Sequence, residues 1–172
     1  MTAYVALLRA VNVGGTGKLP MTELKAMCEE IGFAQVKTYI ASGNVVFVSR
    51  LSEARVRATL NERLETYAGK PVGVFVRTAA EVAAVRDANP FAGEPGNRVV
   101  AIFLDGTLGP DVLDGLKHLD TEVLKPGNRE IYVHYPDGQG RSKLVIPAAG
   151  AGTARNMNTV AKLADMAAAL TA

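Results

Sequence analysis

The residues best suited to chemistry near the start of the chain are three polar side chains around a glycine-rich stretch. In the segment ALLRAVNVGGTGKLP, Arg9 and Asn12 precede the glycines and Lys18 lies directly after them. Backbone N–H groups of a turn can bind an anion such as a phosphate group, and nearby cations strengthen that binding. The segment therefore predicts an anion site, with a plain turn from strand to helix as the alternative.

Two common phosphate-binding motifs do not fit this segment. A P-loop requires glycine where Asn12 stands and serine or threonine where Leu19 stands. A dinucleotide-binding turn requires its third glycine where Pro20 stands. Gly14 and Gly15 have two interpretations. They form a flexible turn with positive φ, or their backbone N–H groups bind an anion. We therefore exclude a nucleoside triphosphatase and a dinucleotide-binding enzyme.

Two further polar stretches are candidates for ligand binding. Arg155, Asn156 and Asn158 open a predicted helix, whose first N–H groups favour an anion. The alternative is that one of the asparagines simply caps this helix. Ser42 and Asn44 lie in a predicted hairpin, where turn formation is the simpler interpretation. The candidate ligand-binding residues are Arg9, Asn12, Gly14, Gly15, Lys18, Ser42, Asn44, Arg155, Asn156 and Asn158.

The sequence contains no convincing nucleophile, acid–base pair or metal-ligand pattern. Cys28 lies in the apolar stripe of a predicted helix, which favours a buried thiol over a reactive one. His118 and His134 are 16 residues apart, without a neighbouring cysteine or carboxylate pattern suited to a metal. We expect no metal and no cofactor, and we leave open whether the chain is an enzyme.

The composition is that of a globular protein with its own core. The chain has 172 residues, of which 48% are hydrophobic and 21% charged. A net charge of +2 is too small to indicate a nucleic-acid-binding protein. A single cysteine excludes an internal disulfide, and no apolar stretch approaches the length of a membrane span. We find no pattern of a signal peptide and expect a cytoplasmic protein without a membrane partner.

The first half predicts the order β-α-β-β-α-β, the split arrangement of ferredoxin-like domains. The segment Ser42-Gly43-Asn44 joins the middle strands as a hairpin. Val56, Leu60 and Leu64 form one stripe of the second helix. The predicted elements are a strand at 3–11, a helix at 21–32, strands at 36–41 and 45–48, a helix opening at 52–53 and a strand at 71–77.

The second half predicts a weaker version of the same order. A strand at 98–105, a helix at 110–119, a hairpin at 123–124 and 131–135, and a helix at about 156–170 are predicted, with the last strand of the unit missing. The equivalent hairpin segments Ser42-Gly43-Asn44 and Pro126-Gly127-Asn128 suggest an internal duplication, although Gly-Asn is common in hairpins. We therefore predict an α+β fold of two ferredoxin-like subdomains, the second incomplete. The predicted domains are 1–78, a helix and turn-rich linker at 79–97, and 98–172.

Four stretches, LLRAVNVGG, TYIASGNVVF, NPF and ARNMNTVAKL, together resemble the DUF1697 family. These are bacterial proteins of about this length whose biochemical function is not established. The order and spacing of the stretches match over nearly the whole chain. The resemblance implies a two-part α+β fold with ferredoxin-like subdomains, and it implies no reaction.

The chain departs from the family pattern at three places. Ala10 stands where the family usually has glycine, from which we expect a backbone without positive φ. Met157 replaces the usual tryptophan and lacks its flat stacking surface, so stacking of a ligand there is not implied for this chain. The segment KLVIPAAGAGT looks shortened and rich in alanine.

Three functions fit these observations. The first is a binding module for an anionic ligand (a phosphate compound, a nucleotide or nucleic acid) in a cleft between the two halves. The residues expected to converge there are Arg9, Asn12, Lys18 and Arg155. The second is an acylphosphatase-like phosphoryl hydrolase in which Arg9 and Asn44 bind phosphate and orient water. The third is a structural or protein-interaction domain without a small-molecule site. Two arginines lining one open cleft would favour the first two functions, whereas burial of each against a carboxylate would favour the third.

Overall fold

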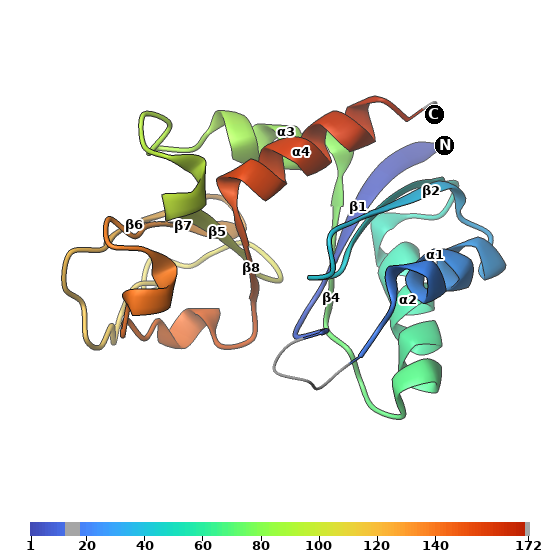
Figure 1. Cartoon of the computed structure of the whole chain (residues 1–172), viewed down its shortest axis with the longest axis horizontal. Coiled ribbons are helices and arrows are strands. Elements are labelled where there is room, and N and C mark those ends of the chain that lie inside the picture. Colours follow the sequence, from blue (N-terminus) through green and yellow to red (C-terminus); the bar gives the residue numbers. More distant parts are fainter. Residues whose placement is uncertain (13–17, 171–172) are drawn as a thin grey trace. The chain divides into compact units, whose positions relative to one another are not determined.

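The structure is a computed structural model that describes residues 1–12 and 18–170. The described residues form a mixed α+β fold with two four-stranded antiparallel sheets and four α-helices (Figure 1). The chain divides into two units, one comprising Met1–Ala83 with Leu163–Ala172 and the other Ala84–Lys162. The candidate residues Gly14 and Gly15 lie outside the described residues. The predicted domain boundaries at 78 and 97 stay a prediction.

The first unit contains the β-α-β-β-α-β order predicted from the sequence. Its sheet has the strand order β2-β3-β1-β4, with all neighbouring strands antiparallel. The elements are β1 (Thr2–Leu8), α1 (Met21–Glu30), β2 (Ala34–Tyr39), β3 (Asn44–Ser49), α2 (Glu53–Ala68) and β4 (Val74–Thr78). Two helices contain residues of both units, α3 (Ala79–Asp87) and α4 (Met157–Ala168).

Both helices of the first unit pack on one face of its sheet (Figure 1). The stripe of Val56, Leu60 and Leu64 on α2 is fully buried, as the 3.6-residue period predicts. Ser52 caps α2 by accepting the N–H of Arg55, because the first N–H groups of a helix have no partner within it.

Strand β1 ends at Leu8, three residues earlier than predicted. The reason is that Ala10 and Asn12 take positive φ angles of 56° and 55°, which no strand can continue. The expectation that Ala10 has no positive φ is therefore wrong, and this position carries the conformation for which glycine is favoured. The chain consequently turns sharply just after Arg9.

The second unit contains β5 (Val99–Phe103), β6 (Val123–Pro126), β7 (Glu130–His134) and β8 (Thr153–Asn156). Its sheet has the order β6-β7-β5-β8, so each strand has the same place as its counterpart in the first sheet. The prediction that the final strand is missing is wrong, because β8 pairs with β5. Its buried side chains, Thr153 and Arg155, are polar, which hides the apolar alternation typical of a strand.

The predicted helix at 110–119 is also wrong, since these described residues form turns. Gly115 and His118 have positive φ angles of 75° and 58°, which break any helix. The apolar residues that suggested a helix, Val112, Leu113 and Leu116, instead pack from this turn region onto the core of the second unit. No helix among the described residues is long and apolar enough to cross a membrane.

Candidate functional site

The candidate site of the first unit is built where the ends of three strands meet. The N–H of Leu8 donates to the carbonyl of Gly43, and the N–H of Arg9 donates to that of Gly73, both at 2.8 Å. Gly43 has a φ of 92°, and a Cβ there would lie 2.6 Å from Cγ2 of Val11. A Cβ on Gly73 would lie 3.0 Å from Cβ of Arg9. The absence of both side chains lets the segment after β1 lie directly against the hairpin and the start of β4.

Asn12 holds the two ends of the first loop together. Its Nδ2 donates to the carbonyls of Leu19 and Ala41, each at 2.8 Å, and its Oδ1 accepts the N–H of Leu19 at 2.8 Å. An asparagine amide has only two donor hydrogens, so both are used within the protein. Asparagine also tolerates the left-handed conformation found here. Asn12 therefore positions the neighbouring Lys18 and offers no donor to a ligand.

An open cavity of about 690 Å³ lies beside this segment. Three cations line it: Arg9 from the end of β1, Lys18 from the end of the first loop, and Lys70 from the link between α2 and β4. Its apolar lining includes Leu64 and the half-exposed ring of Tyr67. No Asp or Glu is among its lining residues in the described part of the chain. The structure thus brings Arg9 and Lys18 to one cavity.

Ser42 and Asn44 are engaged within the hairpin. The side chain of Asn44 is completely buried, and its Nδ2 donates to the carbonyl of Tyr39 at 2.8 Å and to Oγ of Ser42 at 2.9 Å. These contacts close the turn between β2 and β3. Asn44 therefore has no amide hydrogen left with which to orient a water molecule, and we do not include the pair in the candidate site.

Arg155 lies in β8 of the second unit and is 7% exposed. Its Nη1 donates to Oγ1 of Thr153 at 2.8 Å and to the carbonyl of Ala154 at 2.9 Å. Burial lowers the pKa of the Arg155 guanidinium to about 10 because desolvation disfavours the charged form. Arg9 of the first unit, by contrast, is exposed.

The two asparagines at the start of α4, Asn156 and Asn158, make their contacts with residues of the second unit. Oδ1 of Asn156 accepts the N–H of Thr159 at 2.9 Å, which is the geometry of a helix cap. Asn158 is exposed, and a Cβ on Gly96 would lie 2.1 Å from its Oδ1. A ligand-binding role of these two residues stays a prediction.

The other residues singled out in the sequence are placed as follows. Cys28 is fully buried, and burial raises its pKa to about 12, so the thiol stays protonated. Nε2 of His134 lies 3.6 Å from Oε2 of Glu94, and its ring lies beside Phe91 of the NPF stretch. His118 lines a separate cavity of the second unit.

Sequence reasoning missed Lys70. It lies 61 positions after Arg9 in the chain, directly after Gly69, which ends α2 with a φ of 74°. Its place could have been inferred because β4 is the neighbour of β1 in the predicted β-α-β-β-α-β order. The start of β4 must then lie next to the end of β1, since the two strands run antiparallel.

Comparisons with known proteins give a family and a fold. The family model DUF1697, a protein of unknown function, matches residues 1–132. This stretch includes Arg9, Lys18 and Lys70 and ends before β8. A similar solved structure is the conserved bacterial protein SP0830 from Streptococcus pneumoniae, with a TM-score of 0.81 and 26% sequence identity over 96% of this chain and 98% of that chain. No curated protein matches. On the match of its first 132 residues, the chain belongs to the DUF1697 family.

Proposed function

We propose that this protein binds a small anionic ligand that carries a phosphate group, in the cavity of the first unit. The observation that carries this proposal is that Arg9, Lys18 and Lys70 line one cavity without a carboxylate among its described lining residues. Three cations from three different segments attract an anion, and an arginine can bind a phosphate through two parallel hydrogen bonds. A cavity of about 690 Å³ is within the range of small-molecule sites.

The cavity also supports a ligand with an apolar or aromatic part. The ring of Tyr67 and the side chains of Leu64 and Val72 line it beside the cations. A nucleotide combines an anionic group with a flat base that stacks on an aromatic ring. A free nucleotide is therefore the ligand that we favour within the phosphate compounds.

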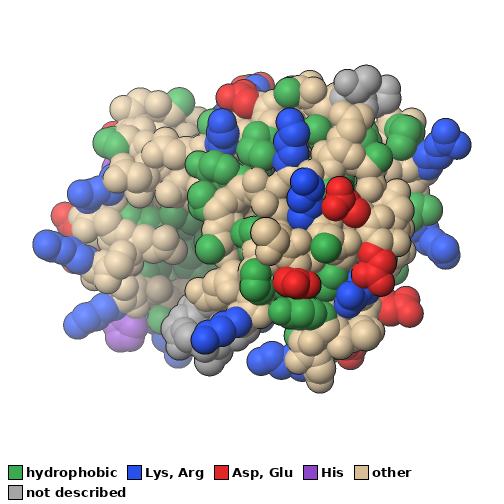
Figure 2. Space-filling model, turned by 45° about the vertical axis from the view of Figure 1, so that its right-hand side comes forward, with side chains coloured by type: hydrophobic (Ala, Val, Ile, Leu, Met, Phe, Trp, Pro, Cys, Tyr) green, Lys and Arg blue, Asp and Glu red, His purple; other side chains and the backbone are tan. Residues whose placement is uncertain are grey.

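Nucleic acid is less well supported as a partner. Binding along a phosphate backbone requires a continuous basic stripe. On the face drawn in Figure 2, the Lys and Arg side chains lie scattered among neutral and acidic side chains instead of forming a band. Arg155 as a further contact of the ligand, in a cleft between the halves, rests on the sequence pattern alone.

We also propose that both units are ferredoxin-like and arose by internal duplication. The common strand order, β2-β3-β1-β4 and β6-β7-β5-β8, supports this proposal. In the second unit, turns replace the helix that would follow β5 and short 3-10 segments replace the one that would follow β7. An anion site in the first unit alone is consistent with this difference, because only that unit has α2 and the cavity beside it.

The experiment is a thermal-shift and calorimetric titration with inorganic phosphate, AMP and ADP. Binding at a hundredfold excess over Kd stabilises the folded state by about 2.7 kcal/mol, which raises the melting temperature by about 5–10 °C. The double variant Arg9→Gln, Lys70→Gln should lose this shift. The matched control is Lys37→Gln, which removes an exposed lysine on β2, away from the cavity.

The titration can reject the proposal in two ways. One is a wild-type protein whose melting temperature does not respond to any of the three anions at millimolar concentration. The other is a shift of equal size in the double variant and in the wild type. A response to AMP and ADP that greatly exceeds the response to phosphate supports the nucleotide over a simple phosphate compound.

A further inference from the structure

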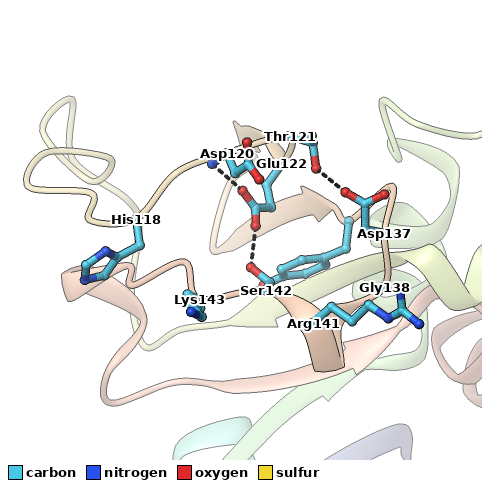
Figure 3. A pocket seen from close by; sticks show the side chains of 10 residues that line it. His118, Asp120, Thr121, Glu122, Asp137, Gly138, Arg141, Ser142 and Lys143 are labelled. Carbon is cyan, nitrogen blue, oxygen red and sulfur yellow. Dashed lines mark hydrogen bonds between the residues drawn. The ribbon is translucent and has the colours of Figure 1, made fainter.

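The second unit contains a polar cavity of about 300 Å³ (Figure 3), and its lining shares no residue with the cavity of the first unit. It is lined by the segment leading into β6, with His118, Asp120 and Glu122, and by residues that follow β7, with Tyr135, Arg141 and Lys143. None of the polar groups in this cavity has a role in the function proposed above. The cavity is therefore an independent feature of the protein.

Two hydrogen bonds join the walls of this cavity (Figure 3). The hydroxyl of Ser142 donates to Oε2 of Glu122, and Oγ1 of Thr121 donates to Oδ2 of Asp137 at 2.9 Å. Oε1 of Glu122 accepts the N–H of Asp120 at 2.8 Å. These bonds hold two segments that are remote in sequence together around the cavity.

The carboxylate of Glu122 carries a negative charge at neutral pH. Its hydrogen bonds from Ser142 and from the backbone lower its pKa, since they stabilise the ionised form. The Oγ of Ser142 also accepts the N–H of Leu144 at 3.1 Å, which fixes its orientation. Glu122 and Ser142 therefore form a fixed anionic wall.

Tyr135 presents an unused hydrogen-bonding group to this cavity. The residue is 6% exposed, and its hydroxyl has no hydrogen-bond partner among the residues that the structure describes. Burial and the charge of Glu122 raise the pKa of Tyr135, so the hydroxyl keeps its proton and can donate. No fully buried side-chain polar atom among the described residues lacks a partner, so this hydroxyl is open to the cavity and can donate to a ligand that enters it.

The charged groups around Tyr135 have both signs. Arg141 and Lys143 flank Ser142 in the chain, and Asp120 precedes Glu122. Within the described chain, none of the side chains of Arg141, Lys143 and Asp120 forms an ion pair or hydrogen bond. A purely anionic ligand would meet carboxylates here, and a purely cationic ligand would meet Arg141 and Lys143.

We propose that this cavity binds a small zwitterion, a free α-amino acid, at a site separate from the anion site of the first unit. The ligand carboxylate is bound by Lys143 and accepts a hydrogen bond from the Tyr135 hydroxyl, whereas Arg141 points to the other end of the cavity (Figure 3). The ligand ammonium is bound by the carboxylates of Asp120 and Glu122. A volume of about 300 Å³, at the lower end of ligand pockets, suits a molecule of this size.

The test is a calorimetric and thermal-shift screen of free amino acids at about 10 mM, which covers affinities as weak as the millimolar range. The best binder is compared with its N-acetyl derivative, which lacks the ammonium charge, and with its amide, which lacks the carboxylate. Each derivative should bind at least about tenfold more weakly, since each loses one of the two charge-assisted contacts.

Variants locate the site. Tyr135→Phe removes only the hydroxyl and should weaken binding about threefold to tenfold, and Lys143→Gln should weaken it further. The control Lys125→Gln changes an exposed lysine of β6 and should leave the affinity unchanged. Arg9→Gln with Lys70→Gln should also leave it unchanged, which separates this site from the anion site.

Three results would overturn the proposal. They are the absence of binding by every free amino acid, equal binding of the N-acetyl derivative, and an unchanged affinity in both Tyr135→Phe and Lys143→Gln. Binding of inorganic phosphate here in place of the amino acid would equally count against a zwitterion site.

Discussion

Replacing Asn12 by alanine should destabilise the first unit more than any other single change at an exposed polar residue of its loops. The side chain makes three hydrogen bonds of 2.8 Å, two to the backbone of Leu19 and one to the carbonyl of Ala41. Leu19 is 3% exposed, so its N–H and carbonyl are poorly placed to find water. The variant therefore leaves backbone groups without partners.

The magnitude follows from the structure in two parts. A net contribution of about 0.5–1.5 kcal/mol for each hydrogen bond gives a loss of about 1.5–3 kcal/mol, since the exposed bond to Ala41 is partly replaced by water. Alanine at the φ of 55° adds about 1 kcal/mol, because a Cβ disfavours the left-handed conformation. We expect a total near 3 kcal/mol for Asn12→Ala. Asn12→Gly should lose about 0.5–1 kcal/mol less, since glycine adopts this φ freely.

The assay is urea-induced unfolding followed by circular dichroism, with hydrogen exchange of the Leu19 amide as a local readout. The urea midpoint should fall in Asn12→Ala with little change in slope, and the Leu19 amide should lose its protection. Asn128→Ala, at an exposed turn asparagine of the second unit, is the control and should change stability by less than about 0.5 kcal/mol. A loss below about 0.5 kcal/mol in Asn12→Ala, with the Leu19 amide still protected, would refute the reasoning.

Three further changes test other parts of the structure. Ala10→Gly should stabilise the protein by about 0.5–1 kcal/mol in urea unfolding, because Ala10 has a φ of 56°; a decrease in stability would contradict the assigned backbone conformation. Gly43→Ala should cost about 2–4 kcal/mol, since its Cβ would lie 2.6 Å from Val11 and its φ is 92°; a neutral effect would show that the hairpin can move away. The lowered pKa of Glu122 means that its ionised form adds stability above its ordinary pKa, which is lost as the pH falls through the folded value. Melting temperatures from pH 3 to pH 7 should therefore depend less on pH in Glu122→Gln than in the wild type, and identical profiles would show that the bond to Ser142 contributes nothing.

Local pattern alone predicted the elements of the first unit. The stripe of Val56, Leu60 and Leu64 indicates α2 because helical periodicity is a property of neighbouring residues. The β-α-β-β-α-β order follows from such local patterns along the chain. The P-loop is excluded by the identities of two single residues, Asn12 and Leu19. Family membership could also be inferred early, since four short stretches of residues are a linear signal.

The failures of the sequence analysis have a common cause in the second unit. Strand β8 is hidden because its buried residues, Thr153 and Arg155, are polar and obtain their partners only in the folded chain. The helix predicted at 110–119 fails because its apolar residues are buried from turns, where Gly115 has a positive φ. Hydrophobic periodicity cannot distinguish a buried helix face from buried turn residues.

The candidate sites depend on contacts between residues remote in sequence. Lys70 lines the same cavity as Arg9 because β4 pairs with β1. The predicted strand order indicates this neighbourhood, whereas the separation of the two residues along the chain does not. The polar cavity of the second unit likewise arises because Ser142 bonds to Glu122, 20 positions earlier. The amino-acid sequence thus determined the helices, most of the strands and the family, because these depend on local pattern. Tertiary structure decided which charges share a cavity, because strand pairing and long-range hydrogen bonds bring them there.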